Sequence, residues 1–408
     1  MSFLFGTALS GLRASSDALG VTGHNIANAN TTAFKAGAIT FSDVILNTIG
    51  LNGANSPLQI GNGVSVAAIS RDFSQGNLTS AGTPTNMAIQ GNGYFVVKDS
   101  KGAQAFTRAG DFILDKDGFL VTPGGQRVQG YTAVDGQIPT DALLNSLQVP
   151  IGDTINPKIT SEGTLRMNLD AADPVGTQFT ANMQVYDSLG VAHAMSMVYT
   201  KTADLAYSVT AKVDGNPATI APAALTFGSD GKLATPAAPA PLVVTPDQTL
   251  LNGATLPSVN VNMYQADGTP NLTNFASPSG VSSTSQDGFA AGIISGILTD
   301  KSGTLTAVFS NGQTRPIGQI ALATFNSEDG LKALGGNLLS EAIGSGPASI
   351  GKPGSSGRGD VVGQALEQSN VDIATEFTNL IVAQRSYQAN SRVITTFNQA
   401  LQDLLQII

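Results

Sequence analysis

The chain contains no cysteine, and this absence excludes both disulfide bonds and thiolate chemistry. It also contains no run of about 18 apolar residues, the length that a membrane-spanning helix requires. Only His24 and His193 have side chains that titrate near neutral pH, and neither lies in a motif with a nucleophile or a second metal ligand. We therefore expect no membrane insertion and no histidine-based catalytic site.

Charged residues are scarce. They form 12% of the 408 residues, about half of the usual share, and the formal net charge is −9. The surface must therefore consist largely of Ser, Thr, Asn, Gln and Gly, which suits contacts with other proteins. A negatively charged chain does not suit a phosphate backbone, so we expect no nucleic acid partner.

The first residues lack the basic segment and the cleavage site of a secretory signal, and the first positive charge is Arg13. This start is typical of a cytoplasmic protein. Export by a route that uses no cleaved signal is the other interpretation, and the composition does not decide between them.

Apolar residues near the N-terminus recur at alternating spacings of four and three, which is the pattern of a coiled-coil helix. Four glycines within the same stretch weaken an isolated helix, so we expect it to form only when packed. The last forty residues, Ser369–Ile408, repeat the spacing and form a second predicted helix. Its apolar arc near the end is wider than one partner helix covers.

Two alternatives follow for this last helix. It packs on the core of its own domain, or it pairs with the N-terminal helix and buries its remaining face against other chains. Two similar ends around a β middle favour the second. The predicted assembly residues are Leu9, Leu12, Leu19, Ile26, Phe377, Leu380, Tyr387, Ile394, Leu401 and Leu405.

Between the helical ends the pattern changes to short strands separated by turn residues. Gly91–Tyr131 and Gly292–Phe325 are both β-rich, with Asp117 and Asn311 each followed by glycine as hairpin turn signals. A third β region, around residues 179–199, alternates apolar and polar side chains. We therefore predict a mainly β fold with α-helical termini that pair as a coiled coil.

If the two ends pair, the domains between them must be nested and discontinuous. Stretches rich in Gly, Pro and Ser indicate the boundaries. We expect a helical assembly domain at 1–30 plus 369–408, a connecting segment at 31–70 plus 355–368, an inner β domain at 71–140 plus 289–354, and an inserted outer β domain at 141–288.

Two motifs imitate ligand sites without completing them. Gly346–Pro353 has the glycine and lysine spacing of a phosphate-binding loop, but Pro353 replaces the hydroxyl that would hold Mg²⁺. Ile113–Gly124 resembles a calcium loop but lacks ligands at its first and last positions. We expect no metal, nucleotide or other cofactor and no enzyme activity. A carboxylate pair formed by folding stays open as the one route to catalysis.

Three stretches resemble the bacterial flagellar axial family of rod, hook and hook-associated proteins. Ala8–Gly37, with Asn-Ile-Ala-Asn at Asn25–Asn28, resembles the N-terminal signature of that family. Phe106–Tyr131 resembles the shared β motif of hook and rod proteins, and Ser369–Ile407 resembles the C-terminal helix. Together they cover about a third of the chain, and residues 139–288 carry no recognisable signature.

Within the family, hook proteins fit best, because distal rod proteins usually lack the inserted domain and hook-associated junction proteins are usually longer. The resemblance implies export through the flagellar type III apparatus and assembly under a cap into a curved flexible tube, a universal joint that transmits torque from rod to filament. It implies as partners other copies of the chain and the rod, hook cap, junction and export proteins, at an extracellular location in the flagellar hook. A secreted β-rich adhesin with helical oligomerisation ends is the alternative of a different class.

Overall fold

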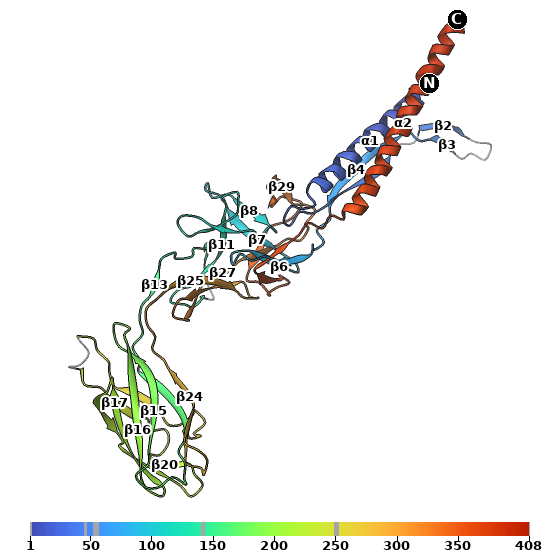
Figure 1. Ribbon diagram of the computed structural model, residues 1–408. Helices are drawn as coiled ribbons and strands as arrows, with labels where there is room; N and C mark the ends of the chain where they lie inside the picture. The colour runs from blue at the N-terminus through green and yellow to red at the C-terminus, as the bar shows by residue number, and fades with distance from the viewer. Residues whose placement is uncertain (1, 45–46, 52–56, 140–142, 249–252, 408) are drawn as a thin grey trace. The chain divides into compact units, whose positions relative to one another are not determined.

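A computed structural model describes residues 2–44, 47–51, 57–139, 143–248 and 253–407 (Figure 1). The chain divides into two compact units. Unit 1 consists of residues 1–151, 296–307 and 314–408, and unit 2 of residues 152–295 and 308–313. Most described elements are strands, with one helix near each end of the chain, and these two helices contact each other. The predicted fold class is therefore confirmed.

The two helices of unit 1, α1 (Ser2–Ala27) and α2 (Ile373–Ile407), pack against each other in antiparallel orientation. The ring of Phe5, near the start of α1, lies 6.3 Å from the ring of Phe397, near the end of α2. Further along α1, a Cβ atom on Gly11 would lie 2.8 Å from the side chain of Asn390. As the chain advances along α1, its partners on α2 move towards the beginning of that helix.

Polar side chains define where each helix ends or begins. Asn28 donates from its side-chain amide to the carbonyl oxygen of His24 at 2.9 Å, in the last turn of α1. Asp372 accepts hydrogen bonds from the backbone amides of Ala374 (2.9 Å) and Thr375 (3.1 Å), which makes it the N-cap of α2. The sequence prediction that this helix starts at Ser369 is therefore wrong by one turn.

Four two-stranded antiparallel sheets lie in unit 1. One of them, β1 with β4, packs against α1. Two others pair strands from opposite ends of the sequence, and they lie where the chain passes from helices to the large sheet. The pairs are β1 (Gly37–Asp43) with β4 (Val64–Arg71), β2 (Asn47–Leu51) with β3 (Pro57–Ile60), β5 (Leu78–Ser80) with β33 (Ala365–Glu367), and β6 (Met87–Gln90) with β32 (Asp360–Gly363).

The large sheet of unit 1 is buried on both faces around its strand β7. Tyr94 and Val96 of this strand belong to one hydrophobic cluster, and Phe95 and Val97 belong to another. Because successive side chains of a strand point to opposite faces, both faces of β7 must be covered. The strands of this sheet that lie wholly in unit 1 are β7 (Tyr94–Lys98), β8 (Gln104–Thr107), β9 (Ile113–Leu114), β10 (Leu120–Val121), β11 (Arg127–Thr132), β12 (Leu144–Ser146), β27 (Thr314–Ile320), β28 (Leu322–Thr324), β29 (Lys332–Gly335), β30 (Leu338–Ser340) and β31 (Ser349–Gly351).

Two strands, β25 (Gly292–Thr299) and β26 (Thr304–Phe309), run from one unit into the other and belong to the same large sheet. The short strand β13 (Thr154–Ile155) pairs with β25 at the edge of this sheet. The turn between β26 and β27 contains Asn311 and Gly312, and Gly312 has a φ of 78°. Asp117 and Gly118 likewise lie in the tight turn between β9 and β10. Both predicted hairpin turns are thus confirmed.

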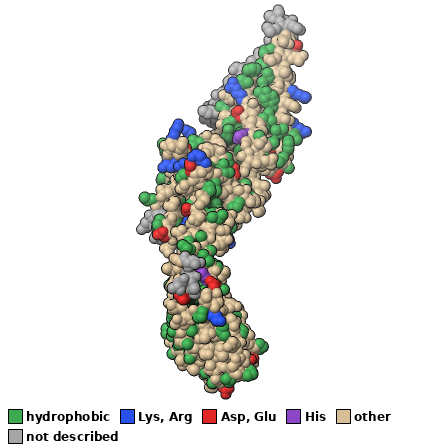
Figure 2. Space-filling model, turned by 60° about the vertical axis from the view of Figure 1, so that its left-hand side comes forward, with side chains coloured by type: hydrophobic (Ala, Val, Ile, Leu, Met, Phe, Trp, Pro, Cys, Tyr) green, Lys and Arg blue, Asp and Glu red, His purple; other side chains and the backbone are tan. Residues whose placement is uncertain are grey.

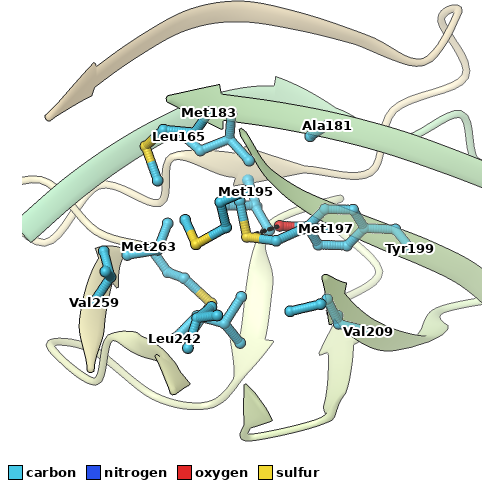
Figure 3. Packing of buried hydrophobic residues seen from close by; sticks show 14 of the residues in the cluster. Leu165, Ala181, Met183, Met195, Met197, Tyr199, Val209, Leu242, Val259 and Met263 are labelled. Atoms are coloured by element: carbon cyan, nitrogen blue, oxygen red, sulfur yellow. Dashed lines mark hydrogen bonds between the residues drawn. The ribbon is translucent and has the colours of Figure 1, made fainter. Parts of the chain in front are cut away.

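Unit 2 is built around one core enclosed by a strongly curved sheet. Strands β15 and β16 show the predicted alternation, with Met183, Met195 and Met197 buried (Figure 3). Residues from both ends of the strand order share this core. The strands of this sheet are β14 (Glu162–Asn168), β15 (Gln178–Tyr186), β16 (Ala192–Ala203), β17 (Ala206–Val213), β18 (Asn216–Ala221), β19 (Ala224–Phe227), β20 (Leu233–Thr235), β21 (Leu242–Thr245), β22 (Val259–Asn262), β23 (Leu272–Thr273) and β24 (Gly280–Gln286).

The incoming and outgoing segments of unit 2 are fastened to each other. Lys158 and Phe289 exchange two backbone hydrogen bonds, each 3.0 Å long. Asp287 accepts from the backbone amides of Ser161 and Glu162 and from the ammonium of Lys158. Phe289 therefore continues the pairing of unit 2 one residue beyond the limit of 288 expected from the sequence. The limit at 140/141 lies outside the described residues, and the expected domain limits stay a prediction.

One histidine of unit 2 lies between two carboxylates. Nδ1 of His193 lies 2.6 Å from Asp214 and Nε2 lies 3.1 Å from Asp187, so the ring connects the turns after β15 and β17. Burial alone would lower the pKa of His193, but the hydrogen bonds and charges of Asp214 and Asp187 outweigh it and raise the pKa above 6.5. The protonated ring satisfies both carboxylates, whereas a neutral ring can donate to only one of them.

We therefore predict that unit 2 loses stability as pH rises through the folded-state pKa of His193. The contribution of the imidazolium is fully present below the unfolded pKa of about 6.5 and disappears above the higher folded value. Asp187 and Asp214, whose pKa values are lowered, contribute in the acid range instead. Urea unfolding midpoints across pH 5–9 measure the effect. His193→Gln should flatten this dependence, and an equal slope in both proteins would contradict it.

Candidate assembly interface

The surface of α1 that faces α2 is made of small residues. Ala8, Ser15 and Thr22, spaced seven residues apart, are all buried. Gly11 approaches Asn390 so closely that a Cβ atom would have to displace it, and Ala383 of α2 is buried opposite this stripe. Small side chains let two helix backbones approach closely, and the seven-residue repeat keeps the same stripe facing the partner helix.

The predicted leucine stripe lies one residue further along α1. Leu9, Leu12, Leu19 and Ile26 are all half-buried, so the small residues form the more buried stripe and the leucines flank it. On α2, the half-buried members of the predicted set are Leu380, Ile394 and Leu401, whereas Phe377 and Tyr387 are exposed. The side chain of Leu405 lies outside the part of the chain that the structure describes. A role of these residues in assembly stays a prediction.

An apolar face of α2 is left uncovered. Phe377, Ile381 and Val382 expose 51%, 49% and 58% of their surface, and Ile373 and Val393 are also exposed. Hydrophobic side chains are visible along the helical part of unit 1 in Figure 2. A row of large exposed apolar side chains on one helix exceeds the scattered exposure that is normal for a protein surface. The wide apolar arc expected from the sequence lies near the end of the helix, so of this exposed face it includes only Val393.

A groove lies between α1, α2 and strand β1. Its cavity is about 500 Å³, and its walls carry small and aliphatic side chains such as Ala18, Val21, Ile39 and Val382. Among the described residues that line this groove, only Glu376 is charged. The two helices and the strand therefore enclose an apolar concave surface that this single chain leaves open.

Asn25, the first residue of the Asn-Ile-Ala-Asn motif, fastens β1 to α1. Its side chain donates to the carbonyl oxygen of Gly37 and accepts from the Gly37 amide, both at 2.8 Å, and the residue is 1% exposed. Gly37 also lies close to Val21: a Cβ atom on Gly37 would lie 3.3 Å from Cγ1 of Val21. The motif thus has a structural role that sequence spacing alone does not reveal.

The two imitations of ligand sites have structural explanations. Asp115 accepts the backbone amides of Asp117 and Phe119, so this carboxylate closes a turn. Lys352 lies 5.8 Å from the ring of Tyr131. The residues after it form turns, where a phosphate loop would start a helix. Residues 346–353 are more than a connecting loop, because they contain β31, which pairs with β28.

Two negative findings concern only the ranges that the structure describes. Among these residues there is no group of three or more His, Asp or Glu placed to hold a metal ion. No helix among them is long and apolar enough to cross a membrane.

Comparisons with known proteins assign a family description to each part of the chain. Residues 5–35 match the Flagella basal body rod protein family, and residues 88–167 match the Flagellar hook protein FlgE/F/G D1 domain. Residues 154–289 match the Flagellar basal body protein FlaE D2 domain, and residues 362–407 match the Flagellar basal body rod FlgEFG protein C-terminal family. Paired terminal helices with two β regions between them therefore define a flagellar axial protein, the class of rods and hooks.

Full-length relatives narrow this class. The chain is 33% identical to the flagellar hook protein FlgE of Escherichia coli and 32% identical to that of Salmonella typhimurium, with 99% of both chains covered in each case. It is 32% identical to the flagellar hook protein FlgE of Borreliella burgdorferi, over 98% of both chains. The chain belongs to the flagellar hook protein family.

A solved structure is consistent with this fold. The crystal structure of Helicobacter pylori flagellar hook protein FlgE2 superposes with a TM-score of 0.52 at 16% identity, covering 71% of this chain and 100% of that one. At this identity the likeness concerns the fold alone.

Replacing Asn25 by Ala should release β1 from α1. The change leaves the Gly37 amide and carbonyl without their partner, which should cost about 1–3 kcal/mol. We expect faster hydrogen exchange at the Gly37 amide and a lower unfolding midpoint for unit 1. Asn30→Ala, at an exposed position just beyond the helix, is the matched control. Unchanged exchange at Gly37 in Asn25→Ala would show that these two hydrogen bonds do not hold the strand.

Proposed function

We propose that the chain is a structural subunit of the bacterial flagellar hook and polymerises with copies of itself into a curved, flexible tube that transmits torque from rod to filament. Its membership of the hook family over nearly the full chain supports this function. The observation that carries the proposal within the molecule is the uncovered apolar face of α2. A hydrophobic helix face that its own chain does not cover is suited to burial in an assembly.

A second copy of the same chain is the occupant that suits this face best. The groove beside α1 is apolar and concave, and only one of the described residues that line it is charged. The low charge of the whole chain, 12%, also limits repulsion between copies packed side by side. A tube of identical subunits could bury the α2 face of one copy against the helices of its neighbours in the same way throughout.

The remaining features of the proposal follow from this role. The subunit would be located in the hook, outside the cell, after export without a cleaved signal through the flagellar type III apparatus. Its partners would be other copies of itself together with rod, hook cap, junction and export proteins. Its role would be structural, with no catalysis. The helical domain would drive assembly, and unit 2 would contribute contacts on the outer surface of the tube.

The assignment as a hook subunit, as opposed to a rod subunit, is supported by the inserted domain. Residues 154–289 match a D2 domain family, and unit 2 occupies this part of the chain. The expected division into a helical domain, a connecting segment, an inner β domain and an inserted β domain is part of the proposal.

Phe377→Asp should abolish polymerisation while the single chain stays folded. Phe377 is half exposed in the single chain, so the carboxylate stays hydrated there. In an assembled helical layer the same carboxylate would be buried without a partner, which costs several kcal/mol per subunit. Sedimentation and electron microscopy of purified subunits measure tube formation, and circular dichroism reports the fold.

Ile343→Asp is the matched control, since Ile343 is fully exposed at 105% and carries the same change from a large apolar to an acidic side chain. Tubes of normal length and number from Phe377→Asp would remove this face of α2 from the assembly interface. Loss of tubes in both variants would mean that the effect is not specific to the helix.

The inserted unit should fold alone and be dispensable for polymerisation. Its two connecting segments pair at Lys158 and Phe289, so a fragment spanning residues 152–295 keeps its ends together. We expect this fragment to be a β-rich monomer with one cooperative thermal transition. A chain lacking these residues should still polymerise, into tubes of altered curvature or strength. An unfolded fragment, or failure of the shortened chain to assemble, would refute the nested arrangement.

A further inference from the structure

Three segments of unit 1 meet where its helices adjoin its β strands. Residues 33–36 follow α1, residues 72–77 follow β4, and residues 367–370 precede α2. We call α1, α2, β1 and β4 the helical part of unit 1, and the strands from β5 to β12 and from β27 to β33 the β part. The last two segments carry the chain from one part to the other and back.

Glu367 lies in the third segment, and its carboxylate contacts the other two. Its Oε1 accepts from the ammonium of Lys35 at 2.6 Å and from the amide of Gly76 at 3.0 Å. Its Oε2 accepts from Nε of Arg108 at 2.9 Å, and its side chain is completely buried. The backbone carbonyl of the same residue accepts from the amide of Ala33 at 2.8 Å.

Arg108 carries this connection into the large sheet. Its guanidinium donates to the carbonyl oxygens of Gly91 (2.8 Å) and Gly93 (2.9 Å), directly before β7, and lies 5.9 Å from the ring of Tyr94. Lys35, from the helical part, also donates to the carbonyl oxygen of Ser74 at 2.6 Å. Each cation thus holds a different part of unit 1 to one shared carboxylate.

Two neighbouring residues make the same junction tight. Asn370 accepts from the amide of Ala36 and donates to the carbonyl oxygen of Asp72, both at 2.8 Å. Gly76 passes so close to Gln368 that a Cβ atom would lie 2.0 Å from its carbonyl oxygen. The three segments are therefore in direct contact, and only glycine fits at residue 76.

Apolar packing does not replace these contacts. The three hydrophobic core clusters of the described residues include no residue of α1 or α2. A cavity of about 300 Å³, lined by Phe34, Lys35, Arg108 and Leu338 among others, lies beside the charged cluster. Phe73, in the second segment, packs against the cluster that contains Tyr94 and Phe106. The junction between the helical part and the β part therefore combines this apolar contact with the hydrogen bonds and charges around Glu367.

The charges can be assigned from their surroundings. Burial would raise the pKa of Glu367, but the charge of Arg108 and the hydrogen bond from Lys35 outweigh it and lower the pKa. Burial lowers the pKa of Lys35, against the opposing effect of Glu367. One carboxylate thus contacts two buried cations. Its removal would leave both without this counter-charge, and Lys35 would keep only the weaker influence of Asp72.

We propose that Glu367 is a positioning residue that couples the helical part to the β part, so that torsional load passes between them through Lys35, Glu367 and Arg108. This inference rests on the proposed function, because load arises only in a subunit that is assembled in a rotating tube. The cluster holds the helical part at a fixed angle to the strands through four charged or backbone partners. A single apolar contact would fix neither the distance nor the angle between the two parts as narrowly as these directional hydrogen bonds.

Glu367→Gln in the full chain tests the coupling, with Lys116→Met as the matched control that breaks the exposed Lys116–Asp117 ion pair. In free subunits we expect the amides of Ala33, Gly76 and Gln368 to exchange at least about tenfold faster in Glu367→Gln, because each depends on this junction. Exchange inside β7 and throughout unit 2 should be unchanged. In assembled tubes we expect a loss of torsional stiffness, measured from the rotation of a tethered bead, while Lys116→Met behaves as wild type.

If Glu367→Gln fails to fold, the variants Lys35→Met and Lys35→Arg test the same coupling. Lys35→Met keeps the Glu367–Arg108 ion pair and should still speed exchange at Gly76 and soften the tube, whereas Lys35→Arg should restore both. Wild-type exchange and stiffness in Glu367→Gln, or in Lys35→Met, would overturn the coupling. If wild-type subunits form no tubes, the proposed function fails, and the exchange rates alone decide whether the junction depends on Glu367.

Discussion

Antiparallel packing of α1 on α2 joins the two ends of the chain, and this constraint determines the layout of everything between them. When the two ends pair, the chain must leave the helices, form its β structure and return to the same place. The small sheets β5–β33 and β6–β32 show this directly, because each pairs a strand from the outgoing segment with one from the returning segment. Unit 2 is inserted in the same way, because the segments that lead into and out of it also pair with each other. Nesting is therefore a consequence of the helix pair.

The helix pair has two kinds of side chain in two different places. Small residues, repeated from Ala8 through Ser15 to Thr22, allow close approach within the chain. Larger apolar residues, such as Phe377 and Ile381, stay on the outside. A pair closed by leucines would bury its strongest hydrophobic contacts internally and would leave little for assembly. The arrangement leaves large apolar side chains of α2 uncovered in the single chain, where the proposed assembly could bury them.

Local patterns in the sequence predicted the local structure. Alternation of apolar residues in β15 and β16, glycine after Asp117 and Asn311, and the heptads of both ends each depend on neighbours within a few positions. The cluster around Glu367 could not be predicted, because its cations lie far away in the sequence and nothing in the local spacing links them. The same holds for His193, where Asp214 comes from another turn. The start of α2 was misplaced because Ser369 and Asp372 are both good caps, and only the backbone geometry chooses Asp372.

The fastening of the segments that lead into and out of unit 2 has a consequence for protein engineering. Lys158 and Phe289 form a mutually hydrogen-bonded antiparallel pair, so their Cα atoms are separated by about 5.5 Å. Any foreign domain whose termini lie at this separation could be grafted in place of the native one without stretching unit 1. The Lys158–Phe289 pair therefore offers one fixed attachment geometry for inserted domains. Enzymes, binding modules or fluorescent reporters with neighbouring termini could thus be carried by this chain in place of residues 159–288.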